Sequence, residues 1–230
     1  MVYQQQDIWK RQAGIRAASM IEDNMIIGLG TGSTAAFFIR ALAQRIEQED
    51  LYLIGAVPSS QATADLAASL GIPLTTLDAH PALDLYIDGA DEIDSQLRLI
   101  KGGGGALLRE KVLASASRRF TVIADITKQV KRLGQRAPVP VEVVPFAVTP
   151  VRRHLESLGA SVTLRRLGDS TFITENHNII LDCTFPNGIS DPEELDALMH
   201  RIIGVVETGL FLNMANQALI GGPDGVQTLP

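Results

Sequence analysis

The stretch Met25-Ile26-Ile27-Gly28-Leu29-Gly30-Thr31-Gly32-Ser33-Thr34 indicates how this chain folds. Its apolar beginning predicts a short buried strand, and residues 35–48 predict a helix directly after it. Three alternating glycines let a ligand approach the backbone, and Thr31, Ser33 and Thr34 add hydroxyl donors. Because the first amides of a helix are unpaired and lie at the positive end of its dipole, this loop favours an anion site. A tight turn with a serine or threonine cap is the alternative.

The loop lacks the features of two common nucleotide motifs. A dinucleotide fingerprint needs a third glycine in Gly-x-Gly-x-x-Gly and an acidic residue at the end of the next strand. Here Ser33 stands at the third position, and Ser59-Ser60 ends the next predicted strand. No Gly-Lys-Ser/Thr follows, which disfavours a nucleoside triphosphate loop. The loop alone leaves the identity of the anion open.

Strands and helices continue to alternate along the first part of the chain. Further strands are predicted at 51–57, 83–88, 97–101 and 120–124, and helices at 61–70 and 106–117. Such alternation predicts an α/β fold with a parallel sheet covered on both faces.

The pattern changes near Leu133 to strand-helix-strand-strand-strand-helix-strand, which predicts a smaller α+β domain. Within it, Thr149 and Asp191 are expected to cap two helices, and residues 171–174 and 178–185 to form a hairpin. The tail, 217–226, is expected to return to the main sheet. The predicted domains are therefore 1–132 plus 208–230 for the larger one and 133–207 for the smaller one.

Length and composition argue against several classes of protein. The 230 residues carry a net charge of −6, whereas proteins that bind nucleic acid present basic patches. No run approaches the ~18 apolar residues of a membrane span, and the first residues lack a signal-peptide pattern. The single cysteine, Cys183, fits a reducing compartment and is interpreted as a small buried apolar residue. We expect a cytoplasmic protein without nucleic-acid or membrane partners.

A second loop, Asp88-Gly89-Ala90-Asp91-Glu92, directly follows a predicted strand. Ligands of parallel sheets bind beyond the carboxyl ends of the strands. Three carboxylates in five residues repel one another unless they bind a cation, polyol hydroxyls or lysines. A hydroxyl-rich sugar suits these acceptors better than a metal ion, and a solvated turn is the alternative.

The third loop is the glycine run, Lys101-Gly102-Gly103-Gly104-Gly105. Its bare amides can hold an oxyanion or a phosphate, and Glu110 follows about one turn into the next predicted helix, where it can act as a base. The alternative places Glu110 in an ion pair on the helix surface. Lys128, after the strand at 120–124, would by itself be interpreted as a surface charge.

Neither a metal site nor a nucleophilic triad is indicated. His80, His154, His177 and His200 are scattered without metal-ligand spacing, and no cofactor motif is present. Amides that can bind phosphate, together with carboxylates and lysines, fit proton transfer on a phosphorylated sugar.

Taken in order, these segments resemble the ribose-5-phosphate isomerase A family over nearly the whole chain. Gly105 and Leu108 depart from the family pattern, where alanine and threonine are expected, and neither position is assigned chemistry. The resemblance rests on the following pieces: Gly30-Thr31-Gly32-Ser33-Thr34, Asp88-Gly89-Ala90-Asp91-Glu92, Lys101-Gly102-Gly103-Gly104, Arg109-Glu110-Lys111, Lys128-Gln129-Val130, Pro140-Val141-Glu142-Val143 and Gly222-Pro223-Asp224-Gly225-Val226.

The resemblance implies a Rossmann-like main domain, an inserted ferredoxin-like domain and a homodimer or homotetramer. It also implies an aldose–ketose isomerase of the non-oxidative pentose phosphate pathway, which interconverts D-ribose 5-phosphate and D-ribulose 5-phosphate without metal or cofactor. Glu110 would be the base that forms an enediolate, with Asp88 or Asp91 assisting ring opening and Lys101 stabilising the enediolate. The substrate-binding residues that it implies are Thr31, Gly32, Ser33, Thr34, Asp88, Gly89, Ala90, Asp91, Lys101, Gly102, Gly103, Gly104 and Lys128.

Two other functions share features with this interpretation. A non-catalytic sugar-phosphate sensor of the same fold would need a DNA-binding helix-turn-helix and a basic face, for which the first 25 residues are too short. A related acyl-CoA transferase would need a glutamate nucleophile and a much longer chain.

Overall fold

The computed structural model describes residues 2–48 and 50–230, which group into two compact units. The larger unit comprises Met1–Ala90, Arg109–Lys128 and Met214–Pro230, and the smaller unit comprises Asp91–Leu108 and Gln129–Asn213. Each unit is described by itself below. The domains expected from the sequence, 1–132 plus 208–230 and 133–207, stay a prediction.

The larger unit contains a six-stranded sheet in the order β15-β14-β6-β3-β1-β2. All neighbours in it are parallel except β14 and β15, which form an antiparallel hairpin at one edge. The tail therefore returns to the main sheet, as predicted. The strands are β1 (Ile26–Leu29), β2 (Gly55–Pro58), β3 (Leu85–Asp88), β6 (Phe120–Asp125), β14 (Gln217–Gly222) and β15 (Gly225–Leu229).

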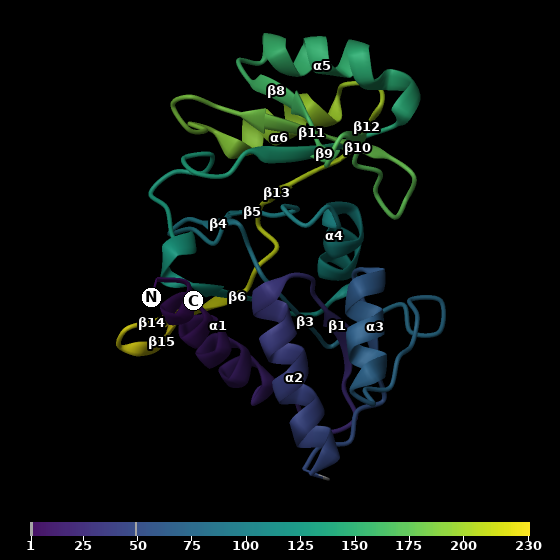
Figure 1. Cartoon of the computed structure of the whole chain (residues 1–230), viewed down its shortest axis with the longest axis vertical. Helices are drawn as coiled ribbons and strands as arrows, with labels where there is room; N and C mark the ends of the chain where they lie inside the picture. Colours follow the sequence, from purple (N-terminus) through teal and green to yellow (C-terminus); the bar gives the residue numbers. More distant parts are fainter. Residues whose placement is uncertain (1, 49) are drawn as a thin grey trace. The chain divides into compact units, whose positions relative to one another are not determined.

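Helices α1 (Val2–Ala18) and α2 (Ser33–Glu47) lie side by side and pack on this sheet (Figure 1). Helix α3 (Gln61–Ser69) packs against β2 and α2, and α4 (Leu107–Ala116) precedes β6. Strands β3 and β6 are buried along their whole length, which explains their continuous apolar sequences. The predicted α/β fold is confirmed.

The smaller unit contains a four-stranded antiparallel sheet in the order β12-β7-β11-β8. With its two helices the chain order is βαββαβ, which is the ferredoxin-like arrangement. The sequence thus correctly predicts a smaller α+β domain. Its elements are β7 (Val139–Val143), α5 (Val148–Ser157), β8 (Ser161–Leu164), β11 (Ile179–Thr184), α6 (Pro192–His200) and β12 (Val205–Thr208).

Short strands complete the smaller unit. Three form a sheet in the order β13-β5-β4, namely β4 (Glu92–Ile93), β5 (Leu99–Ile100) and β13 (Leu210–Phe211). Two more, β9 (Arg166–Leu167) and β10 (Ser170–Thr171), form a hairpin. Single-turn 3-10 helices, η1 (Ile126–Lys128) in the larger unit and η2 (Pro145–Ala147) in the smaller one, follow β6 and β7.

Of three local predictions in the smaller unit, one is confirmed, one is wrong and one is met only in part. Asp191 caps α6 as expected, because its side chain accepts the Glu194 N–H. Thr149 does not cap α5: the turn η2 runs directly into the helix, so the cap is Ala147. The hairpin expected between 171–174 and 178–185 is reduced to one bridge, Ile173 to Ile179, because β10 pairs with β9.

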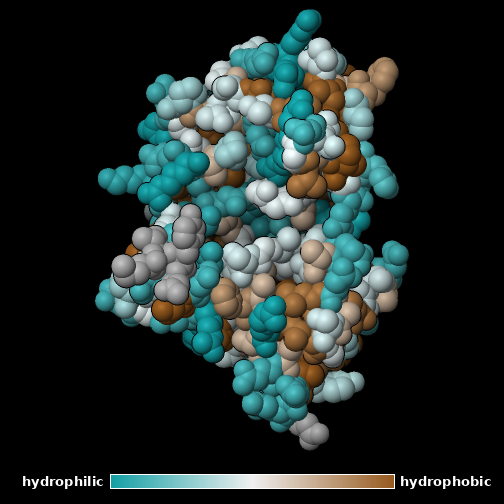
Figure 2. Space-filling view, viewed as in Figure 1, coloured by the Kyte–Doolittle hydropathy of each residue, from teal (hydrophilic) through white to brown (hydrophobic). Residues whose placement is uncertain are grey.

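Polar and charged side chains cover much of the face shown in Figure 2, with apolar side chains exposed in patches. In the smaller unit, Phe146 and Ile203 are almost fully exposed beside a hollow of about 630 Å³ that Leu198 and Arg201 also line. Cys183 is buried in the core of this unit, as interpreted from the sequence. Over the described part of the chain, the helices lack the length and apolarity needed to cross a bilayer.

Candidate functional site

In the larger unit, the loops after β1 and β3 lie at the same edge of the sheet. The two strands are parallel neighbours with Leu29 opposite Ile87, so the segments that follow them leave the sheet side by side. Asp88 is fully buried, and its Oδ1 accepts the N–H groups of Thr31 at 3.0 Å and Gly89 at 2.7 Å. The structure therefore brings the first and second predicted loops together through one carboxylate.

Gly30 makes this approach possible. A Cβ at this position would lie 2.0 Å from Oδ1 of Asp88, a distance that no side chain tolerates. Gly30 is thus required for close contact between two loops. The sequence instead predicted that this glycine serves the approach of a ligand.

The hydroxyl of Thr31 belongs to a cluster that the sequence does not reveal. Its Oγ1 lies 2.7 Å from Ser59 Oγ, 2.8 Å from Ser60 Oγ and 3.1 Å from Thr63 Oγ1. Ser60 is also the cap of α3, accepting the Thr63 N–H at 3.2 Å. The side chain of Thr31 therefore orders the loops, as does its N–H, which donates to Asp88.

Helix α2 begins without a side-chain cap. Its cap residue is Gly32, whose φ of 104° is in the region that favours glycine, and no side chain caps the first turn. The alternative of a plain turn with a serine or threonine cap is wrong. Gly32 and Ser33 are exposed and Thr34 is half-buried, so a ligand can reach this helix start.

Tyr86 lies beside Asp88, and the charge of Glu110 in the same unit also acts on Tyr86. Glu110 stands in the first turn of α4 and is 3 % exposed, so it does not lie on the helix surface. The Tyr86 hydroxyl donates to Oδ2 of Asp88. Burial raises the pKa of Tyr86 well above its ordinary value, and the charges of Asp88 and Glu110 raise it further. Tyr86 therefore stays a protonated donor between two carboxylates.

Lys128 ends η1, directly after β6, and is half-buried. The turn is held by Asp125, whose Oδ1 accepts the N–H of Thr127 at 2.9 Å and also its hydroxyl. Lys128 thus follows the carboxyl end of a strand next to β3.

In the smaller unit, Asp91 contacts the glycine run. Oδ2 of Asp91 accepts the Gly103 N–H at 2.8 Å, and a Cβ on Gly103 would lie 2.7 Å from Oδ1 of the same carboxylate. Gly102 and Gly105 adopt φ values of 96° and 86°, so both turns of the run favour glycine. Gly103 and Gly104 are exposed, which leaves their backbone accessible.

Lys101 is buried at the start of this run. Its N–H donates to Gly209 O at 2.9 Å, and its ammonium lies 5.4 Å from the centroid of the Phe211 ring. A buried ammonium beside an aromatic face is held in a defined place by cation–π attraction.

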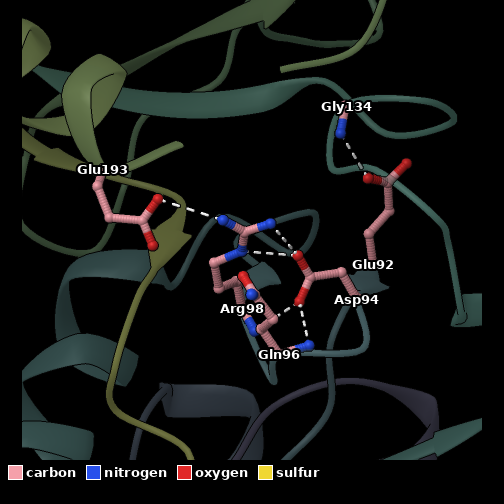
Figure 3. A network of polar contacts seen from close by, with 6 residues as sticks. All are labelled: Glu92, Asp94, Gln96, Arg98, Gly134 and Glu193. Atoms are coloured by element: carbon pink, nitrogen blue, oxygen red, sulfur yellow. Dashed lines mark hydrogen bonds and ion pairs between the residues drawn. The ribbon is translucent and has the colours of Figure 1, made fainter. Parts of the chain in front are cut away.

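Glu92, the third carboxylate of the Asp88–Glu92 loop, has a structural role. It is fully buried, and its two oxygens accept the N–H groups of Gly134 at 2.6 Å, Arg136 at 2.5 Å and Ala137 at 2.8 Å. Figure 3 shows Glu92 with Gly134, near a separate network in which Arg98 joins Asp94 to Glu193. The expected repulsion is thus relieved, because Asp88, Asp91 and Glu92 each accept backbone amides.

Sequence reasoning missed Arg165, which contacts the glycine run, and Asp182, which holds Arg165. Arg165 donates from Nη1 to the carbonyl oxygens of Gly102 and Gly103, and both oxygens of Asp182 hold its guanidinium. Among described residues, no group of three or more histidine, cysteine, aspartate or glutamate side chains is arranged to hold a metal ion.

The sequence is similar to those of known proteins. The sequence profile of ribose 5-phosphate isomerase A (phosphoriboisomerase A) matches residues 55–225. The chain is 52% identical to a ribose-5-phosphate isomerase A of Roseiflexus castenholzii, over 96% of this chain and 95% of that protein. It is 48% identical to the protein of that name from Bacillus mycoides, over 95% and 97% of the two chains.

Solved structures agree with the sequence comparisons. Ribose 5-phosphate isomerase A of Methanocaldococcus jannaschii superposes with a TM-score of 0.91 at 41% identity, covering 96% of this chain and 97% of that one. A D-ribose-5-phosphate isomerase in complex with phospho-erythronic acid gives a TM-score of 0.94 at 38% identity, covering 97% and 98%. This chain therefore belongs to the ribose 5-phosphate isomerase A family.

Proposed function

We propose that this protein interconverts D-ribose 5-phosphate and D-ribulose 5-phosphate through an enediolate, with Glu110 as the general base. Relatives at about half identity along nearly the whole chain carry the name of this isomerase, which supports the reaction. The relative bound to phospho-erythronic acid adds support, because the carboxylate of a sugar acid presents two coplanar oxygens that share negative charge, which resembles the O1 and O2 of a cis-enediolate.

The observation that carries the base assignment is the burial of Glu110 in the first turn of α4. Burial keeps water from the carboxylate. In the proposed step Glu110 removes the C2 proton of the open-chain aldose and returns it to C1. A positioned base contributes about 10²–10⁴-fold to such a step.

We propose that Lys101 and the amide of Gly104 stabilise the enediolate oxygens, and that Gly102 and Gly103 line the substrate, since the Gly103 N–H donates to Asp91. Donors aimed at developing charge are the largest contribution in many enzymes. The exposure of Gly104 and the fixed ammonium of Lys101 support this role.

Asp88 and Asp91 are proposed to have different tasks. Asp88 is fully buried and accepts from Thr31, Gly89 and Tyr86, which suits holding the loops, including Gly89 and Ala90, around the substrate. Asp91 is half-buried, so it is the better candidate for moving a proton during ring opening.

The phosphate is proposed to bind at the start of α2, on Thr31, Gly32, Ser33 and Thr34, with Lys128 as a further substrate contact. The uncapped amides of this helix support that assignment. A remote phosphate held there would keep the carbon chain in place during proton transfer.

We further propose that the protein is a cytoplasmic homodimer or homotetramer and that it serves the pentose phosphate pathway. The single cysteine, buried and free, is compatible with a reducing compartment. The exposed apolar side chains of Phe146 and Ile203 support self-association, which light scattering of the purified protein measures.

A direct test incubates the protein with ribose 5-phosphate in EDTA and follows ribulose 5-phosphate. Product formation at the same rate with and without EDTA is expected. No product in either condition would contradict the isomerase and favour a sensor. Activity that is lost only in EDTA would overturn the metal-free reaction.

A further inference from the structure

Arg165 and Asp182 form a bidentate pair in the smaller unit. Arg165 follows β8, and Asp182 stands on β11, the neighbouring strand. Nε and Nη2 of the guanidinium donate to the two carboxylate oxygens at 2.9 Å and 2.5 Å, and both side chains are less than one-fifth exposed. This fork geometry fixes the plane of the guanidinium.

The remaining nitrogen of the guanidinium donates to the glycine run. Nη1 of Arg165 donates to Gly102 O at 2.7 Å and to Gly103 O at 3.1 Å. The same segment contacts the run a second time, because a Cβ on Gly105 would lie 2.4 Å from the ring of Phe172, whose N–H donates to Arg165 O at 3.0 Å.

Because the peptide unit is planar, the contacts of Arg165 with the two carbonyl oxygens also fix the direction of the next N–H groups. In a planar trans peptide the C=O and N–H groups point in opposite directions. With the carbonyls of Gly102 and Gly103 turned toward Arg165, the N–H groups of Gly103 and Gly104 point away from it. The Gly103 N–H accordingly reaches Asp91. Consecutive glycines have no strong preference of their own for this arrangement, so an external constraint is needed.

We propose that Arg165, held by Asp182, is a positioning residue that turns the Gly103 N–H toward Asp91 and the Gly104 N–H toward the reacting end of the substrate. The inference rests on the proposed isomerase function and adds to it the group that orders the donors. A guanidinium on the carbonyl side also polarises each peptide, which makes its N–H a stronger donor.

The test compares Arg165→Met with two controls in the steady-state assay with ribose 5-phosphate. Arg166→Met removes the exposed neighbouring arginine, and Arg98→Met removes another arginine paired to a carboxylate of the smaller unit. We expect Arg165→Met to lower kcat by about tenfold to a hundredfold, less than the ~10²–10³-fold cost of deleting an oxyanion donor. KM should change by less than about threefold, because the amides act mainly in the transition state.

Binding of phospho-erythronic acid gives a second readout. Its affinity should fall with kcat/KM in Arg165→Met and stay near the wild-type value in both controls. Folded Arg165→Met with wild-type kcat would overturn the inference, as would an equal loss of kcat in Arg98→Met. If Arg165→Met does not fold, Arg165→Lys decides: an intermediate kcat at unchanged KM supports positioning, and a wild-type kcat overturns it. A wild-type protein without turnover would instead refute the proposed function.

Discussion

The N–H of Thr31 donates to Oδ1 of Asp88 at 3.0 Å, which joins the loops that follow β1 and β3. The contact depends on Gly30, because the carboxylate occupies the place where a side chain would begin. Two segments that are 57 residues apart in the chain are thereby held in one arrangement at the carboxyl edge of the sheet.

Gly30→Ala should therefore destabilise the larger unit. The new methyl group must displace Asp88, and overpacking of this kind costs about 1–3 kcal/mol, occasionally more. Urea unfolding measures the change. Gly89→Ala is the matched control, because a Cβ there meets only Ile123 O at 3.8 Å. Equal stability of the two variants would contradict the account of Gly30.

Tyr86→Phe tests the buried hydrogen bond to Asp88. The variant keeps the ring stacked on Phe120 but leaves the carboxylate without this donor. We expect a loss of about 1–3 kcal/mol in the free energy of unfolding, as for other buried groups that lose a partner. Tyr52→Phe, at a position that is 67% exposed, should be near neutral. A stable Tyr86→Phe would show that the contact contributes little.

Ser33→Ala combined with Thr34→Val tests the phosphate assignment. Loss of ground-state binding should raise KM by about tenfold and leave kcat within about threefold, since the phosphate is remote from the reacting carbons. Ser69→Ala, which removes an exposed helix hydroxyl, should leave both constants unchanged. A double variant with wild-type KM would move the phosphate elsewhere.

His200 should make stability depend on pH. Hydrogen bonds to Asp196 and Glu207 raise the pKa of His200 from 6.5 to about 10. Folding therefore favours the charged imidazolium, and this stabilisation is complete below pH 6.5 and is lost as the pH rises through about 10. The difference in unfolding free energy between wild type and His200→Gln should be larger at pH 6 than above pH 10. The same difference at both values would contradict this linkage.

The sequence predicts the larger sheet well because β1, β2, β3 and β6 are short, mostly apolar segments that alternate with helices or loops along the chain. It also predicts a second, smaller α+β unit. It fails where long-range contacts decide local structure. The cap of α5 is Ala147 because a preceding turn runs into the helix, and residues 171–174 keep only one bridge to 178–185 because β10 pairs with β9.

Within the candidate site, the loops were found from glycines and carboxylates, whereas their supports were not. Arg165 stands in Leu164-Arg165-Arg166-Leu167, where two arginines resemble ordinary surface charges. Only the pairing of β8 with β11 brings Asp182 to one of them. Glu92 was grouped with two other carboxylates, and its three amide partners lie more than 40 residues further along the chain.

The base role of Glu110 is tested most directly by the kcat of Glu110→Gln, measured with ribose 5-phosphate beside the exposed control Glu47→Gln. Glutamine preserves the shape of the buried side chain and removes its basicity. The account predicts a loss of at least about 10²-fold in kcat, as expected for general-base catalysis, with affinity for phospho-erythronic acid nearly unchanged. Retention of more than about a tenth of the wild-type kcat would contradict the assignment of Glu110 as the base.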